Sequence, residues 1–172
     1  MNYVAPKTAH EASKALTQEG AFALAGGTDL LVKLKTQFLS PSLVVDIKQI
    51  PKIMSIEESA DGWWIGAATP CAEIVEHKSL SQDWPGVVEA LSLIGSTQIQ
   101  GRATLGGNLC NASPAADSVP ALIAASGTCI ISGQTGEREE PIEKIVMSPG
   151  VNALEKGEFV LGFKLPKPTN SS

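Results

Sequence analysis

The apolar residues of the first 50 positions fall in short blocks whose spacing alternates between helix and strand. Residues 8–19 predict a helix, because Thr8 can cap it with Glu11 three residues later and Gly20 can end it. Residues 21–26 then predict a short buried strand, residues 28–37 a helix, and residues 42–47 a β-branched strand. This order predicts a βαβ unit with a parallel strand pair.

Beyond Pro51 the pattern predicts a longer mixed region. Strands are expected at 53–59, 62–69, 128–133 and 158–166, helices at 70–77, 85–95 and 119–125, and a solvated turn with a short edge element at 137–145. Residues 104–118 hold almost no bulky apolar side chain to pack. We therefore expect an α+β fold with a small βαβ lobe over residues 1–52, a larger mixed lobe over 53–166, and a polar tail over 167–172.

The composition is that of a folded domain and argues against several kinds of partner. Hydrophobic residues make up 43% of the 172 residues, which is enough for a real interior. The net charge is −5 and the 13 basic residues are scattered, so nucleic acid is not an expected partner. Because we find no membrane-length apolar run and no signal-peptide core, we expect a cytoplasmic protein without a transmembrane segment.

The cysteines and histidines predict no metal site. Cys71, Cys110 and Cys129 are far apart and form no CxxC motif, so we expect three reduced thiols rather than zinc or iron–sulfur ligands. His10 and His77 have no nucleophile or ligand cluster beside them in the sequence. We find neither a nucleophile–base pair nor paired carboxylates, and we therefore expect no catalytic side chain in this chain.

The segment LAGGTDLL, residues 24–31, carries the first candidate site. Gly26 and Gly27 lie between a predicted strand and a predicted helix, where glycine permits positive φ and close approach of a ligand. Thr28 and Asp29 then begin the helix, where free N–H groups favour an anion such as phosphate. A tight turn with an ordinary Thr or Asp N-cap explains the segment equally well. No GxGxxG dinucleotide fingerprint is present here.

The segment TLGGNLCNASPAADS, residues 104–118, repeats the glycine pair. It adds hydroxyl and amide side chains, and Asp117 precedes a predicted helix, where it either accepts from a ligand or caps the helix. A surface Ω-loop is the alternative for the whole segment. An Ω-loop leaves the second glycine pair unexplained. Two anion-ready turns on two lobes predict one elongated, doubly phosphorylated ligand in the cleft between them.

Four segments together resemble a known family: LAGGTDLLVKLK (24–35), LVVDIKQI (43–50), WIGAAT (64–69) and QIQGRATLGGNLCNASPAADSVPALIA (98–124). The chain resembles the FAD-binding medium subunit of the molybdenum hydroxylases, of the aerobic carbon monoxide dehydrogenase and xanthine dehydrogenase type. The last segment is the most specific, and the resemblance covers essentially all 172 residues. It implies the two-lobed FAD-binding domain of the vanillyl-alcohol-oxidase-like (PCMH) type.

The resemblance also implies a set of FAD contacts. The first glycine turn corresponds to the family's first pyrophosphate and ribityl contact, the second glycine pair to its second, and further polar contacts follow. Ile94 stands where relatives can place an aromatic side chain near the flavin, and Val160 at a position flanking the isoalloxazine. The implied set is Leu24, Ala25, Gly26, Gly27, Thr28, Asp29, Ile94, Thr104, Gly106, Gly107, Asn108, Asn111, Asp117 and Val160.

The function that the resemblance implies is electron transfer. In such complexes a large subunit with a molybdenum cofactor oxidises the substrate, a small subunit with two [2Fe–2S] clusters passes the electrons on, and non-covalent FAD delivers them to NAD, a quinone or oxygen. Such subunits usually continue into a C-terminal lobe, which the polar tail would begin. A stand-alone flavin oxidoreductase and a non-catalytic nucleotide-binding module remain as alternatives.

Overall fold

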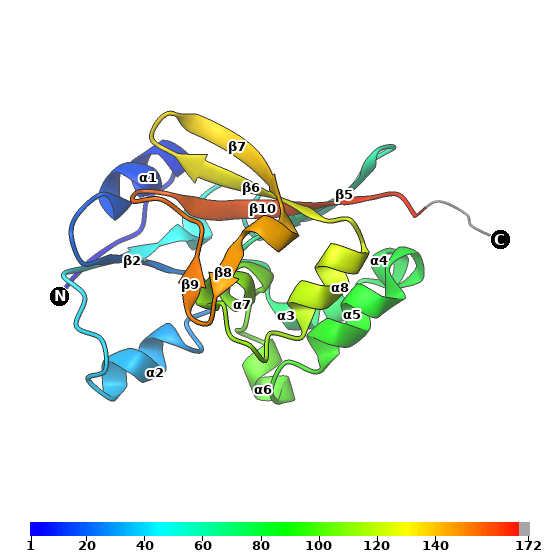
Figure 1. The fold of residues 1–172 in the computed structure, drawn as a ribbon, viewed down its shortest axis with the longest axis horizontal. Helices are drawn as coiled ribbons and strands as arrows, with labels where there is room; N and C mark the ends of the chain where they lie inside the picture. The colour runs from blue at the N-terminus through cyan, green and yellow to red at the C-terminus, as the bar shows by residue number, and fades with distance from the viewer. Residues whose placement is uncertain (169–172) are drawn as a thin grey trace.

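The computed structural model describes residues 1–168 (Figure 1). A three-stranded parallel sheet has the order β1-β3-β2, with β1 at Asn2–Val4, β2 at Ala21–Leu24 and β3 at Leu43–Asp46. Helix α1 (Ala9–Leu16) connects β1 to β2, and helix α2 (Leu30–Lys35) connects β2 to β3. The predicted βαβ unit and its parallel pairing are confirmed, and β1 extends the sheet beyond the prediction. Residues 169–172 of the predicted tail lie outside the described residues.

The second sheet is antiparallel and has five strands in the order β4-β5-β10-β6-β7. Its strands are β4 (Ile56–Glu58), β5 (Gly62–Gly66), β6 (Thr128–Gly133), β7 (Gly136–Pro141) and β10 (Phe159–Pro166), and a small hairpin is formed by β8 (Val146–Ser148) and β9 (Val151–Asn152). The remaining helices are α3 (Cys71–Val75), α4 (Lys78–Asp83), α5 (Pro85–Ser92), α6 (Thr97–Gln100), α7 (Leu105–Asn111) and α8 (Ser118–Ala124), with 3-10 turns η1 (Ile47–Gln49) and η2 (Ile142–Lys144). In Figure 1 helices α3 to α8 gather below this sheet, and α2 stands apart at the lower left.

Local sequence explains where α1 begins. The Thr8 hydroxyl accepts a hydrogen bond from the Glu11 backbone N–H at 3.2 Å, as the sequence predicts for an N-cap. The Glu11 carboxylate accepts in return from the Lys7 N–H at 3.1 Å. Ala12 and Leu16 lie on the buried face of this helix. Because the cap fixes the residue at which α1 begins, it helps to fix which side of the helix faces the core.

Strand β2 differs from its prediction, because it is not buried. Phe22 and Ala23 are exposed, and Ala21 and Leu24 are only partly covered. The strand lies at the edge of its sheet, since β3 is its one neighbour there, and residues 21–23 line a cavity. A short apolar run predicts burial equally for an interior strand and for a strand that faces a cavity.

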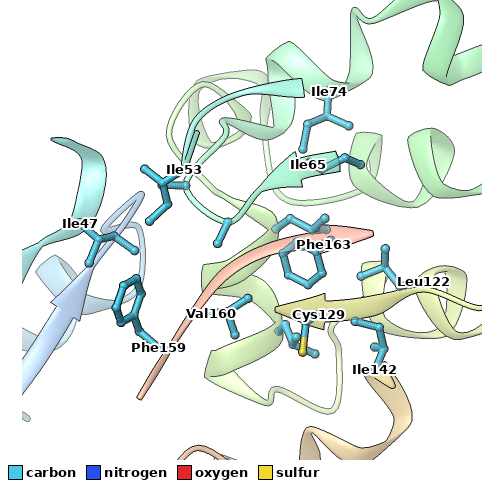
Figure 2. Packing of buried hydrophobic residues seen from close by; sticks show 14 of the residues in the cluster. Ile47, Ile53, Ile65, Ile74, Leu122, Cys129, Ile142, Phe159, Val160 and Phe163 are labelled. Atoms are coloured by element: carbon cyan, nitrogen blue, oxygen red, sulfur yellow. The ribbon is translucent and has the colours of Figure 1, made fainter. Parts of the chain in front are cut away.

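One core connects the two sheets (Figure 2). Phe163 of β10 packs at its centre, near Ile65 of β5 and Cys129 of β6. Ile47, which follows β3, lies beside Phe159 at the beginning of β10, so the core reaches from the large sheet to the small one. Ile47 and Phe159 also line one cavity, so the residue that follows β3 and the start of β10 both border it.

Candidate functional site

A cavity of about 710 Å³ lies between the small parallel sheet and the helical side of the large sheet. This volume is in the usual range for sites that bind small molecules and cofactors. The cavity brings together twelve of the fourteen residues in the sequence-predicted set: Ala25, Gly26, Gly27, Thr28, Asp29, Ile94, Thr104, Gly106, Gly107, Asn108, Asn111 and Val160. The segments that supply them lie far apart in sequence, so the fold and not the local motif assembles the site.

The first glycine turn offers unpaired donors to this cavity. Gly27 has φ +80°, which glycine adopts without strain. Within residues 1–168, the backbone N–H groups of Gly26, Gly27, Thr28 and Asp29 have no hydrogen-bond partner. The Asp29 side chain makes no capping hydrogen bond to α2, which leaves the ordinary N-cap interpretation without support. Four free donors in one turn fit an oxygen-rich anion.

A partly buried network of side chains contacts this turn. Lys48 donates to the Ala25 carbonyl at 3.1 Å and pairs with Asp46 at 2.7 Å, and the Tyr3 hydroxyl donates to Asp46 at 2.7 Å. Burial raises the pKa of Asp46, but the hydrogen bonds from Lys48 and Tyr3 outweigh burial and hold this pKa below its ordinary value. The same hydrogen bond to Asp46 raises the pKa of Tyr3. Asp46 is therefore ionised at neutral pH and keeps Lys48 on the turn.

The second glycine pair lies in a helix, which corrects its interpretation as an anion-ready turn. The Thr104 hydroxyl caps α7 by accepting from the Gly107 N–H at 3.1 Å. The Gly106 N–H donates to the Ala67 carbonyl at 3.0 Å, and the Asn108 N–H to the Thr104 carbonyl at 2.9 Å. These N–H groups already have protein partners, so they are not free donors like those of the first turn. The Ω-loop alternative is wrong as well, because residues 105–111 are helical.

The glycines of the site serve two different purposes. A Cβ at Gly26 would lie 1.9 Å from the Arg102 carbonyl oxygen, and one at Gly106 would lie 2.7 Å from the Ala67 carbonyl oxygen. Both positions are glycine because backbone packs against backbone. A Cβ at Gly107 would meet only the Thr104 hydroxyl, at 3.0 Å. Gly107 therefore leaves space in the cavity itself, which a larger side chain would fill.

Two asparagines of α7 line the cavity with their amide oxygens already paired. The Asn108 side-chain oxygen accepts from the Ser118 hydroxyl, and the Asn111 side-chain oxygen accepts from Lys33 Nζ at 2.9 Å. Their Nδ2 groups donate to no protein acceptor among residues 1–168. Because each carbonyl is occupied, the free half of each amide is a donor. The α7 side of the cavity therefore also suits a ligand rich in acceptors.

Two residues of the predicted set lie elsewhere. Leu24 does not line the cavity, and its side chain lies against the position that a Cβ on Gly27 would occupy. Asp117 is exposed, lies outside the cavity lining and makes no capping hydrogen bond to α8. The N-cap alternative for Asp117 has no counterpart in the structure, and the position of Asp117 outside the cavity lining argues against the predicted ligand contact. The sequence places Asp117 before a helix but does not show which side of the chain faces the cavity.

The structure adds cavity residues that the sequence analysis missed. Lys33 of α2 lines the cavity, as do Asn152 of β9 and the turn at residues 154–158 before β10. Asn152 donates to the Cys110 carbonyl at 2.8 Å and so joins the β8–β9 hairpin to α7. One signal in the sequence points to Lys33. It stands four residues after Asp29, so the two residues lie on the same face of a helix. Nothing in the sequence pattern indicates the turn at 154–158.

The thiols remain protonated at neutral pH. Cys110 lines the cavity, and burial raises its pKa to about 12. Burial likewise raises the pKa of Cys71 to about 11 and that of Cys129 to about 12. A thiol, unlike a thiolate, is a poor nucleophile and metal ligand. In the described part of the chain, no group of three or more His, Cys, Asp or Glu is arranged to hold a metal ion.

No helix among residues 1–168 is both long and apolar enough to cross a membrane. The longest helices, α1 and α5, have eight residues each, well short of the roughly 20 residues that a transmembrane helix needs.

Comparison with known proteins adds a family to this geometry. The family model described as "FAD binding domain in molybdopterin dehydrogenase" matches residues 1–168. The 6-hydroxypseudooxynicotine dehydrogenase complex subunit alpha of Paenarthrobacter nicotinovorans is 31% identical over 99% of this chain and 58% of its own length. The carbon monoxide dehydrogenase medium chain of Hydrogenophaga pseudoflava is 31% identical over 95% of this chain and 58% of its own length. The chain thus spans about three fifths of these relatives.

Solved structures support the same fold. A chain of carbon monoxide dehydrogenase from Hydrogenophaga pseudoflava superimposes with a TM-score of 0.94 at 28% identity, over 99% of this chain and 60% of that one. UDP-N-acetylenolpyruvylglucosamine reductase from Thermus caldophilus has a TM-score of 0.58 at 15% identity, over 97% of this chain and 56% of that one, a likeness of fold alone. The predicted α+β, two-lobed fold is confirmed by these neighbours.

Proposed function

Because this chain belongs to the family of FAD-binding domains in molybdopterin dehydrogenases, we propose that it binds FAD non-covalently in the cavity as part of a flavoprotein oxidoreductase subunit. The observation that carries this proposal is the row of free N–H groups at residues 26–29 beside a cavity of about 710 Å³. The diphosphate of FAD carries oxygen atoms that can accept hydrogen bonds from these N–H groups, which have no acceptor in the described part of the protein.

The residues present fit the parts of FAD. The N–H groups of Gly26 to Asp29 suit phosphate oxygens, while the amide donors of Asn108 and Asn111 suit acceptors on the opposite wall. Gly107 keeps the space between these walls open. In this proposal the first turn supplies the phosphate donors, and α7 supplies side-chain amides and space. This division replaces the equal roles that the sequence analysis gave to the two glycine pairs.

The apolar wall suits the flavin ring. Ile94 and Val160 line the cavity together with Ala67 and Phe159, and Val160 and Phe159 are 3% exposed. A close apolar surface of this kind excludes water from a ring that lies on it. When bound, FAD supplies the redox chemistry, and the protein supplies binding, orientation and electrostatics. The chain's own residues hold the diphosphate at one end and shield the ring at the other.

We propose further that the flavin passes electrons from partner subunits to an external acceptor. The proposed partners are a large subunit with a molybdenum cofactor and a small subunit with [2Fe–2S] clusters. Support comes from relatives that are named as medium chains or FAD-binding subunits, such as the carbon monoxide dehydrogenase medium chain and the Escherichia coli O157:H7 xanthine dehydrogenase FAD-binding subunit. Co-purification of such partners with a tagged version of this chain in its native host tests this part of the proposal.

A flavin titration tests the cofactor directly. The chain is titrated with FAD, FMN and riboflavin, and binding is followed by flavin fluorescence. We expect at least about tenfold tighter binding of FAD than of riboflavin, because riboflavin lacks the phosphates that the first turn can bind. Equal affinity for all three compounds, or no binding of any, would contradict the proposal.

A further inference from the structure

Lys33 is a cation that lines the cavity without an acidic partner. Its Nζ donates to the neutral side-chain oxygen of Asn111 at 2.9 Å. Asp29 lies four residues earlier, the spacing at which acid–base pairs form on a helix, and it also lines the cavity. No carboxylate lies within ion-pair distance of Lys33 among residues 1–168. The positive charge of Lys33 is thus left uncompensated by the protein.

The other lysines near the site differ from Lys33. Lys156 also lines the cavity and has no ion pair among residues 1–168, but it is exposed and lies in the turn before β10. Lys48 also reaches the first turn, but its charge is compensated by Asp46 at 2.7 Å. Lys35, on the same helix as Lys33, is exposed and lies outside the cavity lining. Lys33 itself is partly buried and stands on α2, directly after the four free N–H groups of residues 26–29. An ammonium group that has no ion-pair partner and lies beside free amide donors is suited to bind an anion.

We propose that Lys33 is the cation that neutralises the diphosphate of the bound dinucleotide, and that it exchanges its neutral partner Asn111 for a phosphate oxygen on binding. This inference rests on the proposed FAD function and assigns the charge in that site to one residue. Lys33 also joins the two lobes across the cavity, since Asn111 lies 78 residues later on α7. The exchange would free the Asn111 side-chain oxygen for the ligand or for solvent.

The test compares three variants of this chain. Lys33→Gln removes the charge and keeps a donor that can reach toward Asn111, Lys33→Arg keeps the charge, and Lys35→Gln removes a charge from the same helix away from the cavity. Each variant is titrated with FAD and with riboflavin at low and high salt, and its thermal unfolding is recorded. Charge removal at a phosphate contact flattens the salt dependence of binding, which a purely structural role would leave unchanged.

We expect Lys33→Gln to weaken FAD binding by about 10- to 100-fold at low salt. Its salt dependence should flatten, and its riboflavin affinity should stay unchanged. Lys33→Arg and Lys35→Gln should bind FAD within about threefold of wild type. FAD binding by Lys33→Gln at wild-type strength and with wild-type salt dependence would overturn this inference and leave the proposed function intact. An equal loss in Lys35→Gln would also overturn it. Failure of the wild-type chain to bind FAD would overturn both.

Discussion

At the scale of single residues, Gly106 and Gly107 look alike in sequence and differ in what surrounds them. A Cβ at Gly106 would press on the backbone of Ala67, whereas a Cβ at Gly107 would touch only the capping hydroxyl of Thr104. Substitution at Gly106 is therefore a test of packing. Substitution at Gly107 changes mainly the space available to a ligand.

We expect Gly107→Val to abolish detectable FAD binding while the protein still folds, because its side chain would occupy the cavity between α7 and the first turn. Asp117→Ala is the matched control for a residue of the same segment outside the cavity, and it should bind FAD like wild type. Gly86→Ala is the control for a glycine in the first turn of a helix, since a Cβ there meets nothing within 4 Å. Flavin fluorescence and thermal unfolding are measured for all three. Normal FAD affinity in folded Gly107→Val would refute the assignment.

The sequence could indicate the glycine turns but not the directions of individual side chains. Twelve of the fourteen residues that the resemblance implies line one cavity, and the glycine turn at residues 26–27 is the part that the residues themselves indicate. Asp117 belongs to the set through the resemblance and through its position before a helix, and neither determines the orientation of its side chain. Lys33 was missed because a lysine on a short helix usually indicates only a solvated face.

At the scale of elements, the sequence predicted the strand–turn–helix order better than the character of the second glycine segment. Two glycines within four residues argue against a helix, since each costs about 1 kcal/mol relative to alanine. Residues 105–111 are helical nevertheless, because Thr104 caps them and Gly106 packs its backbone on Ala67. Both contacts involve residues outside the helix, and the Ala67 contact spans 39 positions. Tertiary packing here overrides local propensity.

Strand β7 and the turn before β10 are joined by an ion pair that borders the cavity. Arg138 donates two hydrogen bonds to the Glu158 carboxylate, at 2.7 and 2.8 Å, and one to Glu140 at 3.1 Å. The pair lowers the pKa of Glu158, mainly through the hydrogen bonds from Arg138 and against the opposing effect of burial. A lowered folded-state pKa means that the pair contributes stability above the unfolded pKa of glutamate, about 4.3, and that this contribution is lost as the pH falls.

We expect Arg138→Met to lower the free energy of unfolding at pH 7 by about 1–3 kcal/mol, because the Glu158 carboxylate would lose its charged donors while remaining largely covered. The difference between variant and wild type should shrink as the pH falls below about 4.3, where the carboxyl group of the unfolded chain becomes protonated, and should disappear below the lowered folded-state pKa of Glu158. Urea unfolding at several pH values measures both effects. Lys52→Met, which breaks an exposed pair with Glu57, should change stability by less than about 1 kcal/mol. A pH-independent difference for Arg138→Met would contradict the role of Glu158.

At the scale of the whole molecule, the sequence predicts a boundary between two lobes near residue 52, and residues on both sides of it share one core. Ile47 and Ile50 from the first lobe belong to the same buried cluster as Ile53 and Phe159 from the second. The sequence predicts a boundary there because the βαβ pattern ends near Pro51 and two consecutive predicted strands follow. It could not indicate how tightly the lobes pack, since that depends on contacts between residues more than a hundred positions apart. We expect the lobes to be units of architecture and not of folding.

The contact between the two lobes, here called the seam, can be tested at Gly26, whose backbone lies against Arg102 and Ala103. We expect wild type to unfold in one calorimetric transition whose enthalpy equals the van't Hoff value. Gly26→Ala should lower the free energy of unfolding by about 3 kcal/mol or more, since its Cβ would lie 1.9 Å from a carbonyl oxygen that belongs to backbone. Its unfolding should remain a single transition, because the shared core couples the lobes. Gly101→Ala is the matched control, since a Cβ there makes only ordinary contacts at 3.7 Å or more. Two resolved transitions in either protein would show that the lobes fold independently and that the seam at Gly26 does not couple them.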